Sequence, residues 1–295
     1  MERPPLIDME FLEAYSFRGL LNYLKQITKT GNFFFKKDGI TFRETNSTGV
    51  VLVSFKINPQ ELSIYQYKVV DSEGKEVEEL KVGMNLNEMA KKCKGIQKKD
   101  GLGIKIYGGG DNKIHLFFNR AKVESTSHSP KAFVDIEETN YINYTEPKYS
   151  LTNPSFKPSI AAFTKMCSTI GNCNRGSYST FECFEKGIII NGRSPNGSLS
   201  SQEKLGEPEG DKIHGGRGIV IKTPNPIWFS LEVACEILKS MSKFNNLTFS
   251  PIIKFYIEKN LPLKLEISVG TYGNLVIFLR DEKTRVDVDS ELVSN

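Results

Sequence analysis

The sequence has no run of 18 apolar residues, so nothing in it predicts a membrane-spanning helix. The N-terminus, MERPPLIDMEF, lacks the basic-then-apolar layout of a signal peptide, and we therefore expect an intracellular protein that does not act at a membrane. The five cysteines stand singly in apolar patterns, which indicates reduced thiols in a protein core.

Residues suited to catalysis are also scarce. The three histidines, His115, His128 and His214, are scattered, and none shares a short motif with Cys, Asp or Glu at metal-ligand spacing. The glycine-rich stretch 101–113 resembles a phosphate loop, but no Gly-Lys-Ser/Thr follows, so it predicts a hairpin turn. We predict no catalytic residue, no metal site, no cofactor and no enzymatic activity.

The chain also has no large excess of positive or negative charge. The net charge is only +4, which excludes a wholly basic nucleic-acid-binding arm. Any basic surface must therefore be segregated from an acidic one.

What the sequence does contain is an internal repeat. Helical periodicity appears in four places, over residues 15–27, 84–101, 159–171 and 230–244. Segments of period two, separated by glycine or asparagine turns, lie between them in the same order in both halves. The pattern predicts an α+β fold in which each half has antiparallel sheets with one face covered by two helices.

The repeat suggests domain boundaries. We predict an N-terminal domain over 1–122, a connector over 123–147, a C-terminal domain over 148–282 and a disordered tail over 283–295. The connector is polar with isolated apolar residues, so we expect it to lie against the protein surface.

The four predicted helices each have an apolar face and a polar face. In the second, Leu86, Met89, Ala90 and Cys93 form an apolar stripe, whereas lysines such as Lys91 occupy the other side. A single basic helix face is usually just solvated surface. Basic faces at equivalent places of a repeated unit would instead merge into a cationic surface that attracts phosphates without reading bases.

Three strings of the sequence carry a family resemblance. Residues 38–57, 82–95 and 261–279 resemble, in this order, a strand–turn–strand, the second helix and the closing hairpin of the sliding clamps of the proliferating cell nuclear antigen family. The similarity extends over roughly residues 9–281 and is divergent, which suggests a viral or otherwise fast-evolving member.

The resemblance implies a ring, usually a homotrimer, with helices around a central hole and sheets outside. Double-stranded DNA would pass through the hole without sequence preference, and the ring would tether a DNA polymerase and other proteins that carry a clamp-binding motif, with a clamp loader as a further partner. We expect such a protein in the nucleus or in a viral replication compartment. The positions that match the basic residues of the family's helices, together with basic residues on the same helix faces, are Arg18, Lys25, Lys91, Lys94, Lys98, Lys165, Lys239 and Lys243.

The resemblance also implies a pocket for partner peptides beneath the connector. Its matching positions are Leu52, Ile142, Tyr144, Pro262 and Phe278. Leu52 and Phe278 have an alternative interpretation as ordinary strand core. Four positions depart from the family pattern: Glu232, which we assign to the DNA-facing side of the fourth helix, Glu185 at the place of the family's modifiable lysine, and Gly49 and Asp281 at the pocket.

The residues leave two other functions open. One is a monomeric or dimeric processivity factor, or a checkpoint-type clamp, with the same fold. The other is a two-domain enzyme of unrelated type. A ring would also satisfy the open edge strands of a monomer, and the resemblance implies, by position in the family, that its pairing edges lie in residues 112–120 and in the segment after Gly192.

Overall fold

The computed structural model describes residues 4–119, 132–139, 144–173, 178–193, 198–207, 212–215, 218–221 and 226–282. The elements of the N-terminal half are β1 (Ile7–Phe11), α1 (Tyr15–Ile27), β2 (Thr30–Lys36), β3 (Gly39–Thr45), β4 (Val51–Ile57), β5 (Ile64–Tyr67), β6 (Leu80–Asn85), α2 (Leu86–Lys92), β7 (Gly101–Ile106), β8 (Lys113–Asn119) and β9 (Ala132–Glu137). Those of the C-terminal half are α3 (Ile160–Cys173), β10 (Tyr178–Phe184), β11 (Gly187–Arg193), β12 (Leu199–Gly206), β13 (Lys212–Gly215), β14 (Gly218–Ile221), β15 (Phe229–Ala234), α4 (Cys235–Met241), β16 (Lys254–Tyr256), β17 (Leu263–Val269) and β18 (Gly273–Leu279). Short 3₁₀ turns are η1 (Pro59–Glu61), η2 (Cys93–Gly95) and η3 (Phe244–Asn246).

The two halves repeat one order of elements, as the sequence predicts. A helix is followed by three strands (β2–β4 and β10–β12), then by a strand that leads into a short helix (β6–α2 and β15–α4), and then by three more strands (β7–β9 and β16–β18). By this correspondence β4 is the counterpart of β12, and β9 is the counterpart of β18. The predicted α+β fold with antiparallel sheets is confirmed.

One strand pair joins the halves. β18 pairs with β4 in antiparallel register from Gly273↔Ile57 to Leu279↔Val51, and this junction makes a single sheet in the order β16-β17-β18-β4-β3-β2-β6-β9-β8-β7-β1-β5. A second sheet has the order β12-β11-β10-β15, and β13 and β14 form a separate hairpin.

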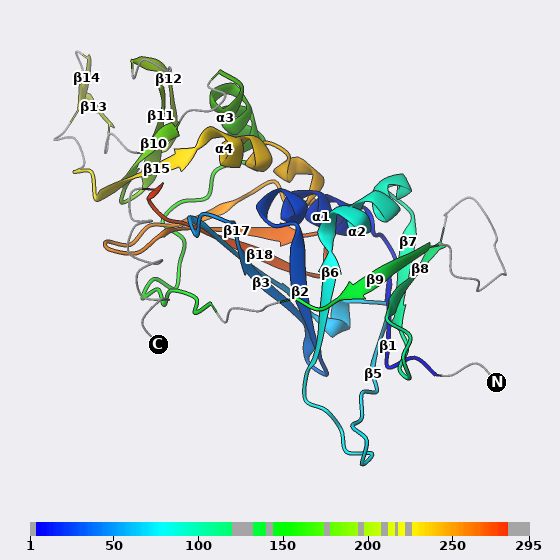
Figure 1. The fold of residues 1–295 in the computed structure, drawn as a ribbon. Helices are drawn as coiled ribbons and strands as arrows, with labels where there is room; N and C mark the ends of the chain where they lie inside the picture. The colour runs from blue at the N-terminus through cyan, green and yellow to red at the C-terminus, as the bar shows by residue number, and fades with distance from the viewer. Residues whose placement is uncertain are drawn as a thin grey trace.

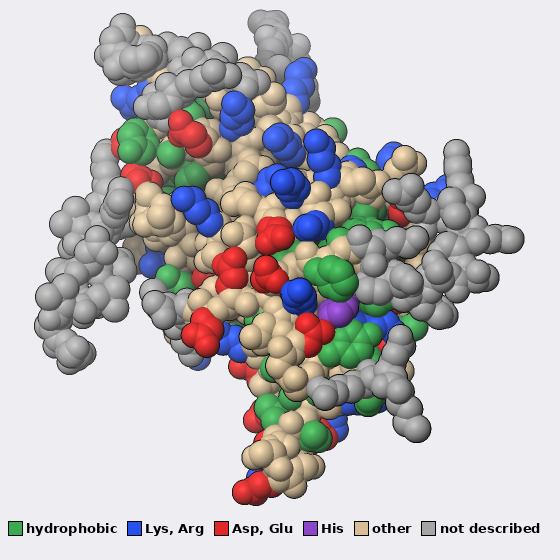
Figure 2. Space-filling model, turned by 45° about the vertical axis from the view of Figure 1, so that its right-hand side comes forward, with side chains coloured by type: hydrophobic (Ala, Val, Ile, Leu, Met, Phe, Trp, Pro, Cys, Tyr) green, Lys and Arg blue, Asp and Glu red, His purple; other side chains and the backbone are tan. Residues whose placement is uncertain are grey.

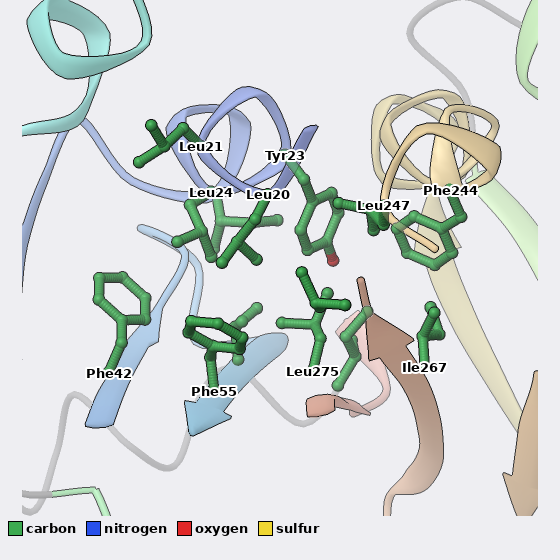
Figure 3. Packing of buried hydrophobic residues seen from close by; sticks show 14 of the residues in the cluster. Leu20, Leu21, Tyr23, Leu24, Phe42, Phe55, Phe244, Leu247, Ile267 and Leu275 are labelled. Atoms are coloured by element: carbon green, nitrogen blue, oxygen red, sulfur yellow. The ribbon is translucent and has the colours of Figure 1, made fainter. Parts of the chain in front are cut away.

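The helices form a layer on one side of the sheets (Figure 1). α1 lies between α2 and the η3–α4 segment, and α3 packs against α4 and η3, so the layer runs without interruption across both halves. Figure 3 shows Leu20, Tyr23 and Leu24 of α1 above Phe55 and Leu275 of the sheet, where they form the core. This burial of one face leaves the opposite face of each helix at the surface.

The observed helices differ from the predicted ranges at two places. α2 ends at Lys92 and continues only as η2, so Lys98 lies in a turn beyond the helix. The fourth helix begins at Cys235, because the preceding residues alternate between buried and less buried positions and form β15. Glu232 is therefore on a strand, paired with Thr180 of β10, and the assignment of this residue to the fourth helix is wrong.

Residues 132–137, inside the predicted connector, form β9. This strand pairs with β8 from Ala132 to Asp135 and with β6 at Ile136 and Glu137. β8 is consequently flanked by β7 and β9, so the prediction of an edge at 112–120 is wrong. We propose that the N-terminal domain ends near Glu137 and that the connector follows it. The predicted tail and Ile142 lie outside the described residues.

Candidate nucleic-acid interface and peptide pocket

The predicted cations lie on the helices or in the turns that directly follow α2 and α4. Arg18 and Lys25 of α1 are half-buried; the exposed cations are Lys91 of α2, Lys94 of η2, Lys98, Lys165 of α3, Lys239 of α4 and Lys243. Figure 2 shows Lys and Arg side chains gathered at the height of the helices, with Asp and Glu side chains grouped below them. The basic and acidic surfaces are thus segregated on this face, as the small net charge requires.

A groove separates α1 from the α4–η3 segment and brings three of the predicted cations together. Its volume is about 250 Å³, and its lining includes Arg18, Lys25 and Lys243. The amide side chains of Asn22, Gln26 and Asn246 also line it, and sequence reasoning missed these residues because an isolated Asn or Gln on a helix is not a signal. Cations beside amide donors suit phosphate oxygens.

Arg18 also forms contacts within the helix layer. Its Nη1 donates to the carbonyl oxygens of Ile96 (2.6 Å) and Lys94 (3.3 Å), and its guanidinium lies 4.4 Å from the centre of the Tyr15 ring. A cation at the carbonyl end of a helical segment is favourable, because the helix dipole is negative there. Arg18 therefore ties α1 to the η2 turn that follows α2, and it adds positive charge to the groove.

Local capping fixes the start of α2 and α3. The Asn85 side chain accepts from the backbone N–H groups of Asn87 and Glu88, each at 3.1 Å. The Ser159 hydroxyl accepts from the N–H of Ala162 at 3.1 Å. These caps accept hydrogen bonds from backbone N–H groups that have no partner inside the helix. They therefore fix the residue at which each lysine-bearing helix begins.

Two residues of the predicted peptide pocket, Leu52 and Phe278, lie opposite each other on β4 and β18. Their neighbours in the strands, such as Val51, Val53 and Ile277, belong to the central core, so Leu52 and Phe278 point to the other face of the sheet. Yet Leu52 is only 4% exposed and Phe278 only 1%. These side chains are therefore not part of that core but are covered from outside.

Tyr149, which lies just after the predicted connector, supplies part of this cover. The Tyr149 ring stacks on Phe278 with 6.1 Å between ring centres, and its hydroxyl donates to the Pro262 carbonyl oxygen. Lys264 Nζ lies 5.4 Å from the centre of the same ring. Burial raises the pKa of the Tyr149 hydroxyl, which keeps it a neutral donor. Tyr149 was not among the predicted pocket residues.

Tyr144, which was predicted for the pocket, is half-buried. Its carbonyl oxygen accepts from Arg43 Nη1 at 3.0 Å. The structure thus brings Leu52, Phe278 and Pro262 together around Tyr149, and it ties the backbone of Tyr144 to the same sheet.

The cysteines whose side chains are described are buried free thiols: Cys93, Cys167, Cys183 and Cys235. Burial raises the pKa of the Cys93 thiol to about 12, and it also raises the pKa values of Cys167 and Cys183. The predicted core thiols are confirmed for these four residues. Neutral, inaccessible thiols are poor nucleophiles.

In the described ranges, no three His, Cys, Asp or Glu side chains gather where they could hold a metal ion. The same ranges contain no helix with the length and apolar character needed to span a bilayer. His115 sits beside Asp111, with 2.6 Å between Nε2 and Oδ2, and between the rings of Tyr107 and Phe133.

Comparison with known proteins identifies this arrangement. The N-terminal domain model of proliferating cell nuclear antigen matches residues 6–140, a range that includes β9. The proliferating cell nuclear antigen of Dictyostelium discoideum is 20% identical over 278 residues, which cover 93% of this chain and 98% of the relative. The chain resembles the proliferating cell nuclear antigen family along nearly its whole length.

Two solved structures of proliferating cell nuclear antigens share the fold over more than nine-tenths of the chain. The proliferating cellular nuclear antigen of Entamoeba histolytica superposes with a TM-score of 0.69 at 17% identity, covering 94% of this chain and 99% of that one. The PCNA2–PCNA3 complex of Sulfolobus tokodaii gives a TM-score of 0.67 at 17% identity, with 92% and 98% covered. This resemblance relates the chain to a family of non-enzymatic sliding clamps.

Proposed function

We propose that this chain closes into a homotrimeric ring around duplex DNA and acts as a processivity factor for a DNA polymerase. The observation that carries the proposal is the uninterrupted helix layer, whose outer face presents Lys91, Lys94, Lys165 and Lys239 across both halves. Flexible lysine point charges attract phosphates without fixing a register, which suits a protein that slides along DNA.

The internal repeat supports a specific way to close the ring. Within the chain, β18 pairs with β4. The counterparts of these strands are β9 and β12, and β12 is the end strand of its described sheet. The side of Ala132–Asp135 that faces away from β8 has no strand partner within the described residues. We therefore propose that β9 of one protomer pairs with β12 of the next, in a head-to-tail contact that closes on itself.

Light scattering on the purified chain tests the ring. The expected molar mass is three times 33.2 kDa at micromolar concentration and moderate salt. A mass of one or two chains would overturn the trimer and favour a monomeric or dimeric processivity factor of the same fold.

Polymerase extension of a long primed template tests the function itself. Added clamp should lengthen the products of a partner polymerase without raising its number of initiations, because tethering slows dissociation and leaves the chemical step unchanged. DNA is copied in the nucleus or in a viral replication compartment, and we propose that this chain acts in one of these two places.

A further inference from the structure

We propose that Arg18 is a positioning residue that holds the turn over residues 94–99, and that Lys98 and Lys99 of this turn are phosphate contacts beyond the end of α2. We call residues 94–99 the lysine turn. The inference rests on the proposed clamp function, because it names further residues of the DNA-facing surface.

The contacts of Arg18 supply the first argument. Its Nη1 donates to the carbonyl oxygens of Ile96 at 2.6 Å and Lys94 at 3.3 Å, and its guanidinium carbon lies 4.4 Å from the centre of the Tyr15 ring. The Tyr15 hydroxyl donates in turn to Asn246 Oδ1 at 3.4 Å. A guanidinium held by two carbonyl oxygens and an aromatic ring keeps one orientation, so Arg18 acts chiefly on the backbone that it binds.

The lysine turn is also anchored by its own residues and their neighbours. Cys93, directly before the turn, and Ile96 within it are 0% and 2% exposed, and the Ile96 N–H donates to the Cys93 carbonyl oxygen at 3.1 Å. At the far end, Asp100 Oδ2 accepts from the Gln97 N–H at 2.8 Å, and the Asp100 carbonyl oxygen accepts from the Ala14 N–H at 2.8 Å. Together with Arg18, these contacts fix the backbone of the turn.

The charge of the lysine turn supplies the second argument. The side chains of Lys94, Lys98 and Lys99 are exposed, and no carboxylate among the described residues forms an ion pair with any of them. Asp100, which follows the turn directly, is buried and accepts from a backbone N–H. Cations on a fixed backbone lose less conformational freedom on meeting phosphates than cations on a mobile loop. Arg18 therefore controls how well these three lysines are organised.

Binding of a short fluorescein-labelled duplex at low salt, followed by anisotropy, tests the two phosphate contacts. Lys98→Ala with Lys99→Ala should weaken binding at least threefold and make the dependence of log K on log salt shallower by about 1.8, since each lost phosphate contact removes about 0.9. The matched control is Lys37→Ala with Lys56→Ala, which removes the same charge from exposed lysines of the β2–β3 turn and β4 and should leave binding unchanged. Equal binding by the two double variants would overturn the proposal.

A double-mutant cycle separates positioning from direct contact. Arg18→Ala should weaken duplex binding at least threefold in the parent chain but less than about 1.5-fold in a chain that already carries Lys94→Ala, Lys98→Ala and Lys99→Ala, because Arg18 acts through these lysines. Lys25→Ala is the control, since Lys25 lies on the same helix and lines the same groove as Arg18. It should cost the same factor in both backgrounds. The same cost of Arg18→Ala in both backgrounds would make Arg18 a phosphate contact itself.

Hydrogen exchange reads the turn without DNA. The Ile96 and Gln97 amides, which donate within the turn and its flanks, should exchange at least fivefold faster in Arg18→Ala and at the parent rate in Lys25→Ala. Unchanged exchange in Arg18→Ala would show that the turn is held without Arg18 and would overturn its positioning role. Arg18→Met, which keeps the aliphatic stem beside Tyr15 but loses the donors, provides a second variant should Arg18→Ala fail to fold.

Failure of the lysine turn and failure of the clamp function give different results. If the parent chain binds duplex and stimulates a polymerase but the cycle is additive, the positioning role is overturned and the clamp function stands. If duplex binding shows the expected coupling but no polymerase is stimulated, the clamp function is overturned and the lysine turn remains.

Discussion

At the scale of single residues, Tyr23 of α1 carries a polar group that finds no partner among the described residues. Its side chain is 3% exposed, and its hydroxyl forms no hydrogen bond within the part of the chain that the structure describes. Figure 3 shows the hydroxyl pointing from α1 into the core near Leu247 and Leu275. Burial also raises its pKa above the ordinary range, so the group stays neutral. A desolvated and unpaired hydroxyl destabilises the fold.

Tyr23→Phe should therefore raise the free energy of unfolding by about 1 kcal/mol, because it removes the unpaired hydroxyl and keeps the ring contact with Phe244. Urea denaturation of both proteins measures the difference. Tyr67→Phe is the control, since its hydroxyl donates to the Val77 carbonyl oxygen at 2.8 Å and its loss should lower stability. A Tyr23→Phe protein less stable than the parent would show that the hydroxyl has a partner, such as a buried water.

The buried thiols predict loss of stability in alkali. The Cys93 thiol has an ordinary pKa of 9.0 in the unfolded chain and about 12 in the fold, where burial disfavours the thiolate. The pKa values of Cys167 and Cys183 are raised for the same reason. Between pH 9 and 12 the unfolded chain releases protons that the folded chain keeps, so stability falls as pH rises.

Each of these thiols should lower the free energy of unfolding by about 1 kcal/mol between pH 9 and pH 10. Urea denaturation at these two pH values measures the slope. Cys93→Ala removes one of the thiols, so its slope should be shallower than that of the parent protein. An unchanged slope in that variant would mean that Cys93 already ionises in the fold.

At the scale of elements, Gly19 decides how closely α1 approaches the other half of the chain. A Cβ atom at this position would lie 2.3 Å from the Asn246 carbonyl oxygen, which is backbone of η3. The residue is thus a contact point between the two repeats, directly beside the basic groove.

Gly19→Ala should lower the free energy of unfolding by about 1–3 kcal/mol, because the clash outweighs the roughly 1 kcal/mol by which alanine favours a helix interior over glycine. Thermal or urea denaturation measures the effect. Gln26→Ala, at an exposed position of the same helix, is the control and should be neutral or slightly stabilising. A stabilised Gly19→Ala protein would show that α1 can move away from η3 without loss.

Strong local periodicity explains which elements the sequence predicts well. α1 was predicted over its observed range, because the apolar positions of Phe17, Leu20 and Leu24 are unambiguous. β15 was misread as helix because Leu231 and Ala234 fit a helical stripe as well as Leu231 and Val233 fit a strand. β9 was missed because the polar composition around it is typical of a connector.

Contacts between distant residues explain what the sequence could not predict. Arg43 and Glu146 are 103 positions apart, and Tyr149 and Pro262 are 113 apart, so no local pattern marks either pair. The cation positions were predictable because helix faces are local. The packing of Tyr149 on Phe278 was not predictable, because it depends on how the two repeats and the segment between them come together.

At the scale of the whole molecule, the basic helix layer lies beside an acidic surface. Figure 2 shows the Asp and Glu side chains grouped below the Lys and Arg side chains on one face, and the net charge of the whole chain is only +4. The basic layer is the part that attracts phosphates. A closed ring would turn this layer inward, so that six repeats present their lysines to a single duplex. Each contact then adds to a field that holds DNA in the centre without a tight site.

Reversal of two lysines tests that field. Lys91→Glu with Lys94→Glu should abolish polymerase stimulation on long templates, because it places negative charge on the helix layer of every protomer. Both side chains are exposed, so the free energy of unfolding should change by less than about 0.5 kcal/mol. The matched control is Lys37→Glu with Lys56→Glu, which lowers the net charge equally but alters exposed lysines of the β2–β3 turn and of β4, away from the helices. Primer extension at several salt concentrations compares the variants, and stimulation should also fall with salt in the parent protein. Equal stimulation by the Lys91/Lys94 variant and its control would show that the lysines of α2 and η2 are only solvated surface and that DNA is held elsewhere.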